Sequence, residues 1–233
     1  LLAYAEDING RRQYKIKFKD LDTESTYDYS IENTSGDMAW SKDGRFLFYV
    51  LRDEETLLPF QVKRHEIGTS ISDDSIVYQE IDSTFYTSVG NTRSMDFVEI
   101  NISSTTSSEV RLIRSEDPEL EPEIFLPREN DHLYSVDHDP ASDRFLIESN
   151  WEAINFRLLE TKLEDSRNKN KWKELIPHRE EVLLKSVVPF PQHLVIMERA
   201  NGLRPVSSTS LKLPQNPCVM HPLYASQLRT QTG

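Results

Sequence analysis

An internal repeat constrains the fold of this chain more than any other feature of its sequence. Short segments rich in β-branched and aromatic residues recur at intervals of 44 to 51 residues. Their apolar residues follow the strand period of two, and both faces are apolar, which is typical of strands buried between two layers. The five segments begin at Leu2, Phe46, Phe97, Phe145 and Leu194.

Three further strands accompany these segments, so each unit of about 49 residues is expected to hold four strands. Charged and apolar residues alternate in the second strand of each unit, which predicts one solvent-facing side. The second strands are expected at Gln13–Lys19, Gln61–Ile67, Glu109–Arg114 and Phe156–Leu163. The third strands are expected at Tyr27–Ile31, Ile76–Ile81, Ile124–Leu126 and Trp172–Ile176. The strands that precede each segment are expected at Met38–Trp40, Phe85–Val89, Leu133–Val136 and Val182–Val188.

Four-stranded antiparallel units repeated at about 40–50 residues predict an all-β fold, a β-propeller. One blade cannot bury both of its faces alone, whereas stacking against neighbouring blades buries them. A β-sandwich is the competing interpretation, but a sandwich does not require the same strand order at a fixed period. We expect a partial propeller of four to five blades over residues 1–203, followed by an irregular or non-native polar tail at 204–233.

The charge balance limits the partners of this chain. Its net charge of −12 argues against nucleic acid, which Lys and Arg would have to neutralise, and against anionic membranes. The same charge is compatible with attraction of basic peptides, although we favour a generic acidic surface as its explanation. No apolar run approaches the roughly 20 residues that span a bilayer.

The single cysteine and the N-terminal residues indicate a cytoplasmic chain. One cysteine, Cys218, cannot form an intrachain disulfide. The N-terminus has neither the basic region nor the apolar core of a signal peptide. It also lacks an initiator Met and starts within a strand pattern, so we expect the natural protein to begin earlier.

The sequence contains no recognisable catalytic group. The seven glycines are spaced too far apart for a Gly-x-Ser-x-Gly nucleophile elbow or for a phosphate-binding loop. Cys218 lies in the polar tail, where nothing indicates a partner that would lower its pKa. The six histidines form no metal-binding pair on a helix, and we expect neither a metal nor another cofactor.

Three kinds of polar or aromatic cluster favour structural roles over functional ones. Asp137-His138-Asp139 resembles a Ca²⁺-binding turn, but Asp-rich turns followed by Pro140 also end hairpins. Adjacent carboxylates in strands point to opposite faces, so we interpret these pairs as solvated loop charges. The pairs are Glu54/Glu55, Asp73/Asp74 and Glu116/Asp117, and the tryptophans expected to pack between blades are Trp40, Trp151 and Trp172.

Several segments resemble oligopeptidase B of the prolyl oligopeptidase family. They include LLAYAEDINGRRQYKIKFKDL (1–21), WSKDGRFLFYVLRDEETLLPFQVKRHEIGT (40–69), IVYQEIDSTFYTSV (76–89), SSTTSSEVRLI (103–113), FLPRENDHLYSVDHDPASDRFLIESN (125–150) and HLVIMERANGL (193–203). The resemblance runs in order from Leu1 to about Leu203 and is absent from 204–233. It implies the middle of a seven-bladed propeller that is joined to an α/β-hydrolase domain of the same protein.

The resemblance also implies a function for the propeller. The family's hydrolase domain carries a Ser-Asp-His triad, and this branch cleaves short peptides after Lys or Arg. The propeller would cap that site and admit only small substrates, so the present chain would be inactive alone. The alternative is a stand-alone propeller that acts as a protein-interaction scaffold, which would require a whole number of blades. Arg11 and Arg12 are either a salt-bridge contact with the second domain or a solvated hairpin tip.

Overall fold

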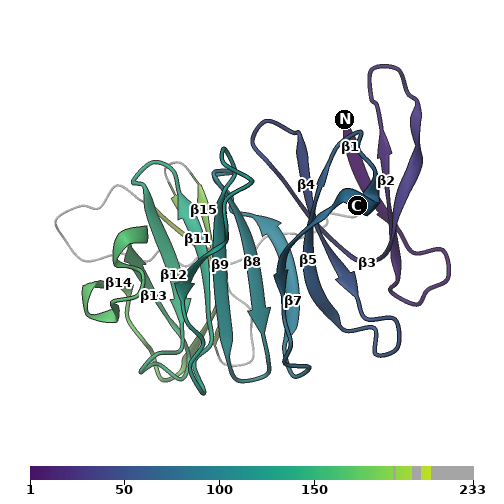
Figure 1. The fold of residues 1–233 in the computed structure, drawn as a ribbon. Helices are drawn as coiled ribbons and strands as arrows, with labels where there is room; N and C mark the ends of the chain where they lie inside the picture. Colours follow the sequence, from purple (N-terminus) through teal and green to yellow (C-terminus); the bar gives the residue numbers. More distant parts are fainter. Residues whose placement is uncertain (191–192, 201–205, 211–233) are drawn as a thin grey trace, which may run out of the picture. The chain divides into compact units, whose positions relative to one another are not determined.

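The computed structural model describes residues 1–190 and 193–200, together with the backbone of 206–210 (Figure 1). These residues form antiparallel strands and three short 3₁₀ helices at Ile71–Asp73, Leu163–Asp165 and Lys169–Lys171. They separate into two compact units, Leu1–Leu133 and a second that begins at Tyr134. No helix in the described part of the chain has the length and hydropathy needed to cross a bilayer.

The first unit contains two antiparallel sheets. One has six strands in the order β1-β2-β3-β4-β5-β6, and the other has four in the order β10-β9-β8-β7. The strands of the first sheet are β1 (Leu2–Glu6), β2 (Tyr14–Lys19), β3 (Thr26–Trp40), β4 (Phe46–Arg52), β5 (Pro59–Glu66) and β6 (Ser75–Gln79). Those of the second are β7 (Tyr86–Asn91), β8 (Phe97–Ser103), β9 (Ser108–Arg114) and β10 (Glu123–Leu126).

Strand β3 differs from the expectation, because the two strands predicted at Tyr27–Ile31 and Met38–Trp40 are halves of one strand. The first half pairs with β2 and the second half pairs with β4, with a register shift between Thr34 and Met38. Gly36 permits the bend, since its φ of +91° is a left-handed conformation that side chains disfavour. A Cβ atom at Gly36 would also lie 3.1 Å from the ring of Tyr14. The chain therefore passes from one four-stranded unit into the next without a loop.

Strand β4 is buried on both faces, as its sequence predicts. Phe48 and Val50 pack into a cluster with residues of the β7–β10 sheet, including Val98 and Ile100. The alternate residues Leu47 and Tyr49 pack on the other face with residues of β2 and β3, which are Ile16, Phe18 and Ile31. Figure 1 shows β7 beside β5, in agreement with the packing of β7 against β3, β4 and β5. One strand thus belongs to two apolar cores.

A buried polar network lies beside the second of these cores. The Nδ1 atom of His65 lies 2.7 Å from Oδ1 of Asp74, and its Nε2 atom lies 3.0 Å from the hydroxyl of Tyr29. The Tyr49 hydroxyl donates to Oδ2 of Asp74 at 2.8 Å, and the Tyr29 hydroxyl accepts the N–H of Gly68. Burial raises the pKa of Tyr49, and the hydrogen bond to Asp74 raises it further. The network joins β3, β4 and β5 to the segment that precedes β6.

The second unit also contains two sheets, in the orders β11-β12-β13-β14 and β15-β16-β17. Their facing residues form one apolar cluster that includes Leu146, Leu158, Leu184 and Ile196. The strands are β11 (Tyr134–Asp139), β12 (Arg144–Ser149), β13 (Arg157–Thr161), β14 (Lys173–Ile176), β15 (Val182–Phe190), β16 (His193–Ala200) and β17 (Val206–Ser210). Every strand range expected from the repeat overlaps a strand of the structure.

Strand β17 lies in the segment for which the sequence predicted no strand. Its backbone pairs with β16 from His193↔Ser210 to Met197↔Val206. The expectation of an irregular tail from residue 204 is therefore wrong for Val206–Ser210, because backbone hydrogen bonds to β16 do not require an apolar pattern. Residues 211–233, which include Cys218, lie outside the described part of the chain, and their expected irregularity stays a prediction.

We predict that Tyr49→Phe destabilises the fold by about 1–3 kcal/mol, because it leaves a buried carboxylate oxygen of Asp74 without its donor. Tyr27→Phe is the matched control, since Tyr27 is partly exposed and makes no hydrogen bond through its hydroxyl in the described structure. Chemical denaturation measures both changes. Equal stability of the two variants would contradict a structural role for this network.

Candidate functional site

Arg11 and Arg12 lie at an exposed turn between β1 and β2, as expected. The turn is organised by Asp7, whose carboxylate accepts the backbone N–H groups of Asn9, Arg11 and Arg12. Arg12 has a positive φ of 59°, which the hydrogen bond of 2.7 Å to Asp7 helps to hold. Neither guanidinium forms an ion pair within the described residues, so both face solvent in this chain. A contact with a second domain stays a prediction.

The Asp137-His138-Asp139 cluster ends the β11–β12 hairpin. The carboxylate of Asp139 accepts the N–H of Ala141 and the hydroxyl of Ser142. His138 is buried against Phe145, with ring centroids 4.9 Å apart. In the described residues, no three His, Cys, Asp or Glu side chains come close enough together to hold a metal ion. The contacts of the cluster are those of a hairpin end, and its lack of a metal stays a prediction.

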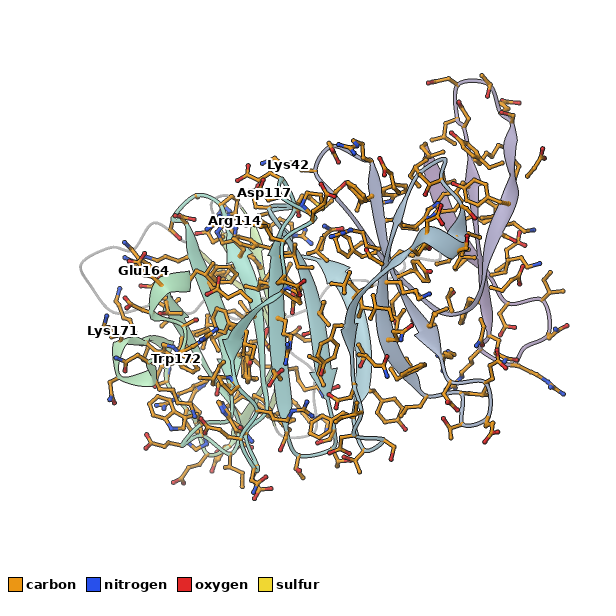
Figure 2. The ribbon with its side chains drawn as sticks, viewed as in Figure 1. Lys42, Arg114, Asp117, Glu164, Lys171 and Trp172 are labelled. Atoms are coloured by element: carbon orange, nitrogen blue, oxygen red, sulfur yellow. The ribbon has the colours of Figure 1, made fainter. Side chains whose placement is uncertain are left out.

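The tryptophans pack against other elements of their own units. The backbone of Trp40 forms two hydrogen bonds of 2.9 Å with the side-chain amide of Asn91, which joins β3 to β7. Trp151 and Trp172 meet edge to face, and the guanidinium of Arg157 covers the ring of Trp151. Trp172 lies with Glu164 and Lys171 around the two 3₁₀ helices that precede β14 (Figure 2).

The first unit contains a hollow of about 250 Å³ that the sequence did not predict. It lies where the turn between β3 and β4 meets the loop between β9 and β10. Figure 2 shows Lys42, Arg114 and Asp117 near this end of the sheets. The lining residues are Asp43, Arg45, Phe46, Glu116, Asp117, Pro118, Glu119 and Leu120.

Hydrogen bonds between the two sheets hold the walls of the hollow. The backbone N–H of Lys42 donates to the carbonyl of Ser115 at 2.8 Å, and its ammonium lies 3.0 Å from Asp96. The hydrogen bond to Asp96 raises the pKa of Lys42, and the charge of Glu116 adds to this effect. Arg64 donates to the carbonyl of Pro118 at 2.7 Å. These contacts fix a turn of one sheet against a loop of the other.

The hollow is strongly acidic. Four of its lining residues are carboxylates, and the cation among the lining residues, Arg45, is bonded to Glu66 at 2.9 Å, while Arg64 lies over the ring of Phe46. Glu116, Asp117 and Glu119 are exposed and form no ion pair with other described residues, which agrees with the interpretation of the first two as solvated loop charges. Pro118, Leu120 and the ring of Phe46 add apolar surface. An acidic hollow with an apolar wall suits the ammonium or guanidinium of a peptide, and it contains no nucleophile–base pair.

A second polar cluster joins the same two sheets at their opposite end. Arg128 lies 2.6 Å from Glu80 and 3.8 Å from Glu109, and its guanidinium covers the ring of Phe85. Burial raises the pKa of Glu80, but hydrogen bonds from Tyr78, from the N–H of Asp82 and from Arg128 outweigh it and lower the pKa overall. Glu80 is therefore held ionised between the sheets.

No catalytic constellation occurs in the described residues. The one close His–Asp pair outside a hairpin turn, His65–Asp74, has side chains exposed by only 0% and 1%, so it cannot contact a substrate. Cys218 and His221 lie outside the described residues. The sheets define an all-β repeat protein whose four-stranded units pack face to face, and the site is an acidic surface rather than a reaction centre.

Comparison with known proteins identifies the family. The description "Prolyl oligopeptidase, N-terminal beta-propeller domain" matches residues 1–231. The chain is 42% identical over 207 residues to dipeptidyl aminopeptidase BI of Pseudoxanthomonas mexicana, covering 87% of this chain and 28% of that protein. It is 33% identical over 204 residues to Protease 2 of Moraxella lacunata, covering 87% and 29%. The solved structure of oligopeptidase B from Leishmania major matches with a TM-score of 0.83 and 27% identity, covering 89% and 29%.

The chain therefore belongs to the prolyl oligopeptidase N-terminal β-propeller family, and its four-stranded sheets are blades of a partial propeller. It spans less than a third of the length of these relatives, as their covered shares of 28% and 29% show. The prediction of the fold class and of the family from sequence is confirmed, but the expectation that the resemblance ends near Leu203 is wrong, since the family match extends to residue 231.

We predict that Arg128→Met destabilises the fold by about 2–4 kcal/mol at pH 7, because it leaves Glu80 ionised and buried without its cation. The pKa of Glu80 is lowered in the folded state, so its contribution is present above the unfolded pKa and is lost as the pH falls through the folded value. The cost of the substitution should therefore shrink in acid. Urea denaturation between pH 3 and 7 measures it, and Arg11→Met is the exposed control. A cost that does not change with pH would contradict this account.

Proposed function

We propose that this chain is the non-catalytic, substrate-gating part of an oligopeptidase B-like serine-type endopeptidase that cleaves short peptides after Lys or Arg. The observation that carries the proposal is the family match over residues 1–231, together with a sequence that has no nucleophile elbow. Catalysis would come from a hydrolase domain of the same protein, and the blades would restrict access to it. We place the protein in the cytoplasm, because its one cysteine, Cys218, cannot form an intrachain disulfide of the kind common in secreted domains.

The preference for basic peptides is supported by charge. The chain has a net charge of −12, and the hollow of the first unit brings together Glu116, Asp117 and Glu119 without paired cations. A surface lined by one sign of charge raises the local concentration of oppositely charged ligands and speeds their association. A short peptide with Lys or Arg would therefore be attracted to the propeller before it reaches a hydrolase site.

Arg11 and Arg12 are proposed to contact the hydrolase domain. Both guanidinium groups lie at an exposed turn and form no ion pair within the described residues, so they are available to carboxylates of another domain. An exposed ion pair contributes little stability by itself, which suits a contact that must open and close. No observation favours the alternative of a stand-alone scaffold.

The relatives leave the exact cleavage reaction to experiment. The 42% identical relative is named a dipeptidyl aminopeptidase, and the structural relative at 27% identity is an oligopeptidase B. An endopeptidase cleaves an Arg substrate whose N-terminus is blocked, whereas a dipeptidyl aminopeptidase requires a free amino group two residues before the bond. Assays of the two substrates with a full-length enzyme that carries this chain distinguish these activities. An enzyme that cleaves the substrate with a free amino group but not the blocked substrate would contradict the endopeptidase assignment.

We predict that the 233-residue chain has no peptidase activity, because none of its described side chains forms a nucleophile–base pair open to substrate. The measurement is release of a fluorophore from blocked Arg and Lys amides by purified chain. Oligopeptidase B is the positive control for the assay. Turnover that a serine-directed inhibitor abolishes would sink the proposal that this chain is non-catalytic.

A second prediction concerns the hollow. We design a chimera in which residues 1–203 replace the matching segment of Protease 2 of Moraxella lacunata, and then introduce Glu116→Gln, Asp117→Asn and Glu119→Gln together. We expect kcat/KM for an Arg-rich peptide at low salt to fall about threefold to tenfold, with little change at high salt or for a neutral peptide.

The control for this experiment carries the same change of charge elsewhere in the first unit. Asp22→Asn, Glu24→Gln and Glu55→Gln alter exposed turns that do not line the hollow. Equal losses in both triple variants would assign the effect to net charge and not to the hollow. If kcat/KM for the Arg-rich peptide falls in neither triple variant, charge steering has no role.

A further inference from the structure

A carboxyl group lies in the joint between the two sheets of the second unit. Glu148, on β12 of the β11–β14 sheet, accepts the backbone N–H of Val187 on β15 at 2.6 Å. Val187 itself belongs to an apolar cluster with Leu146, Leu158 and Leu184. An ionisable side chain is thus the acceptor for a backbone group of the neighbouring sheet, beside an apolar cluster.

The joint depends on this acceptor because β15 is an edge strand. The sheet order β15-β16-β17 leaves one side of β15 without a partner strand. The ladder with β16 is irregular between Leu184 and Ser186. Two N–H groups of β15 bond instead to the neighbouring sheet: that of Leu184 to the carbonyl of Asn155 at 3.0 Å, and that of Val187 to Glu148. Glu148 therefore replaces part of a partner strand.

No cation neutralises Glu148 in the described structure. The strands packed against β12 are β11, β13 and β15. The charge that acts on Glu148 is that of Asp137 on β11, which has the same sign. The other charged or titratable groups of these strands are engaged elsewhere or exposed: His138 with Asp143, Asp139 with Ser142, Arg157 with Glu174, Glu160 with Arg144 and Lys173, and Lys185, whose side chain is exposed.

We propose that Glu148 is a proton-controlled latch, which holds the β11–β14 and β15–β17 sheets together when it is neutral and loosens their joint when it ionises. The neutral carboxyl keeps a carbonyl oxygen that accepts the N–H of Val187, and it buries no charge. The ionised carboxylate keeps the hydrogen bond but places a charge in a partly buried position near Asp137, at the cost of part of its hydration.

The pH range in which the Glu148 carboxyl gains and loses its proton supports this latch. Burial raises the pKa of Glu148 to about 7, the hydrogen bond from Val187 opposes the rise, and the charge of Asp137 adds to it. Because this pKa lies above that of an exposed Glu, the closed joint binds the proton more tightly than the open one. The stability from this group is complete below the pKa of the open state and is lost as the pH rises through about 7.

Hydrogen exchange at the Val187 amide in the 233-residue chain tests the latch between pH 5 and 8.5, after correction for the intrinsic pH dependence of exchange. The opening constant is the equilibrium constant between the open and the closed joint at the Val187 amide. In the parent chain it should rise by up to about tenfold per pH unit towards pH 7, because opening releases one proton, and then level off. In Glu148→Gln, which keeps a carbonyl acceptor but cannot ionise, the constant should not change with pH. Glu164→Gln, at an exposed carboxylate, is the matched control and should follow the parent.

Two results would overturn the latch: a pH-independent opening constant in the parent chain, or the same rise in Glu148→Gln as in the parent. Asp137→Asn provides an independent measurement should Glu148→Gln not fold. Because this variant lacks the charge of Asp137, its opening constant should level off at a lower pH than that of the parent chain. An unchanged curve in Asp137→Asn would count against the proposal.

Discussion

The burial of one strand on both of its faces is the constraint on which the first unit depends. In β4, Phe48 and Val50 pack against residues of the neighbouring β7–β10 sheet, while Leu47 and Tyr49 pack against residues of β2 and β3. Such a strand cannot lie at a protein surface, because one apolar face would be exposed to water. Each sheet therefore requires a neighbour on either side, and the propeller arrangement of the family meets this requirement by repeating the sheet.

Polar contacts at the rims then fix how neighbouring sheets meet. Apolar packing is non-directional, but the side chain of Asn91 pairs with the backbone of Trp40 as a strand would, and Arg128 holds Glu80 at the other end. In the second unit, Glu148 has a similar position between β12 and β15. At the two charged contacts, those of Glu80 and Glu148, pH or salt can change how firmly neighbouring sheets are held together.

The acidic hollow follows from the same packing. Its carboxylates come from a turn at residue 43 and a loop at residues 116–119, far apart in the sequence, and the bonds of Lys42 and Arg64 to the opposite loop bring them together. The hollow contains no nucleophile, so its chemistry is attraction of cations. This agrees with a family in which the propeller is an accessory to a peptidase.

The sequence by itself determined the all-β repeat and nearly all strand positions, because alternation of apolar residues at a fixed interval is a local property that burial between sheets demands. The family was indicated separately, by the resemblance of whole segments to known members. It did not reveal that β3 is one strand, because the two halves of β3 pair with different strands across the left-handed Gly36, and this pairing is not visible in the sequence. Pairing of Val206–Ser210 was missed because it depends on backbone bonds to β16. Only the tertiary structure decided the hollow and the environment of Glu148, because both bring together residues that are remote in the chain. The distances between these residues set the electrostatic field in the hollow and the hydration that Glu148 loses.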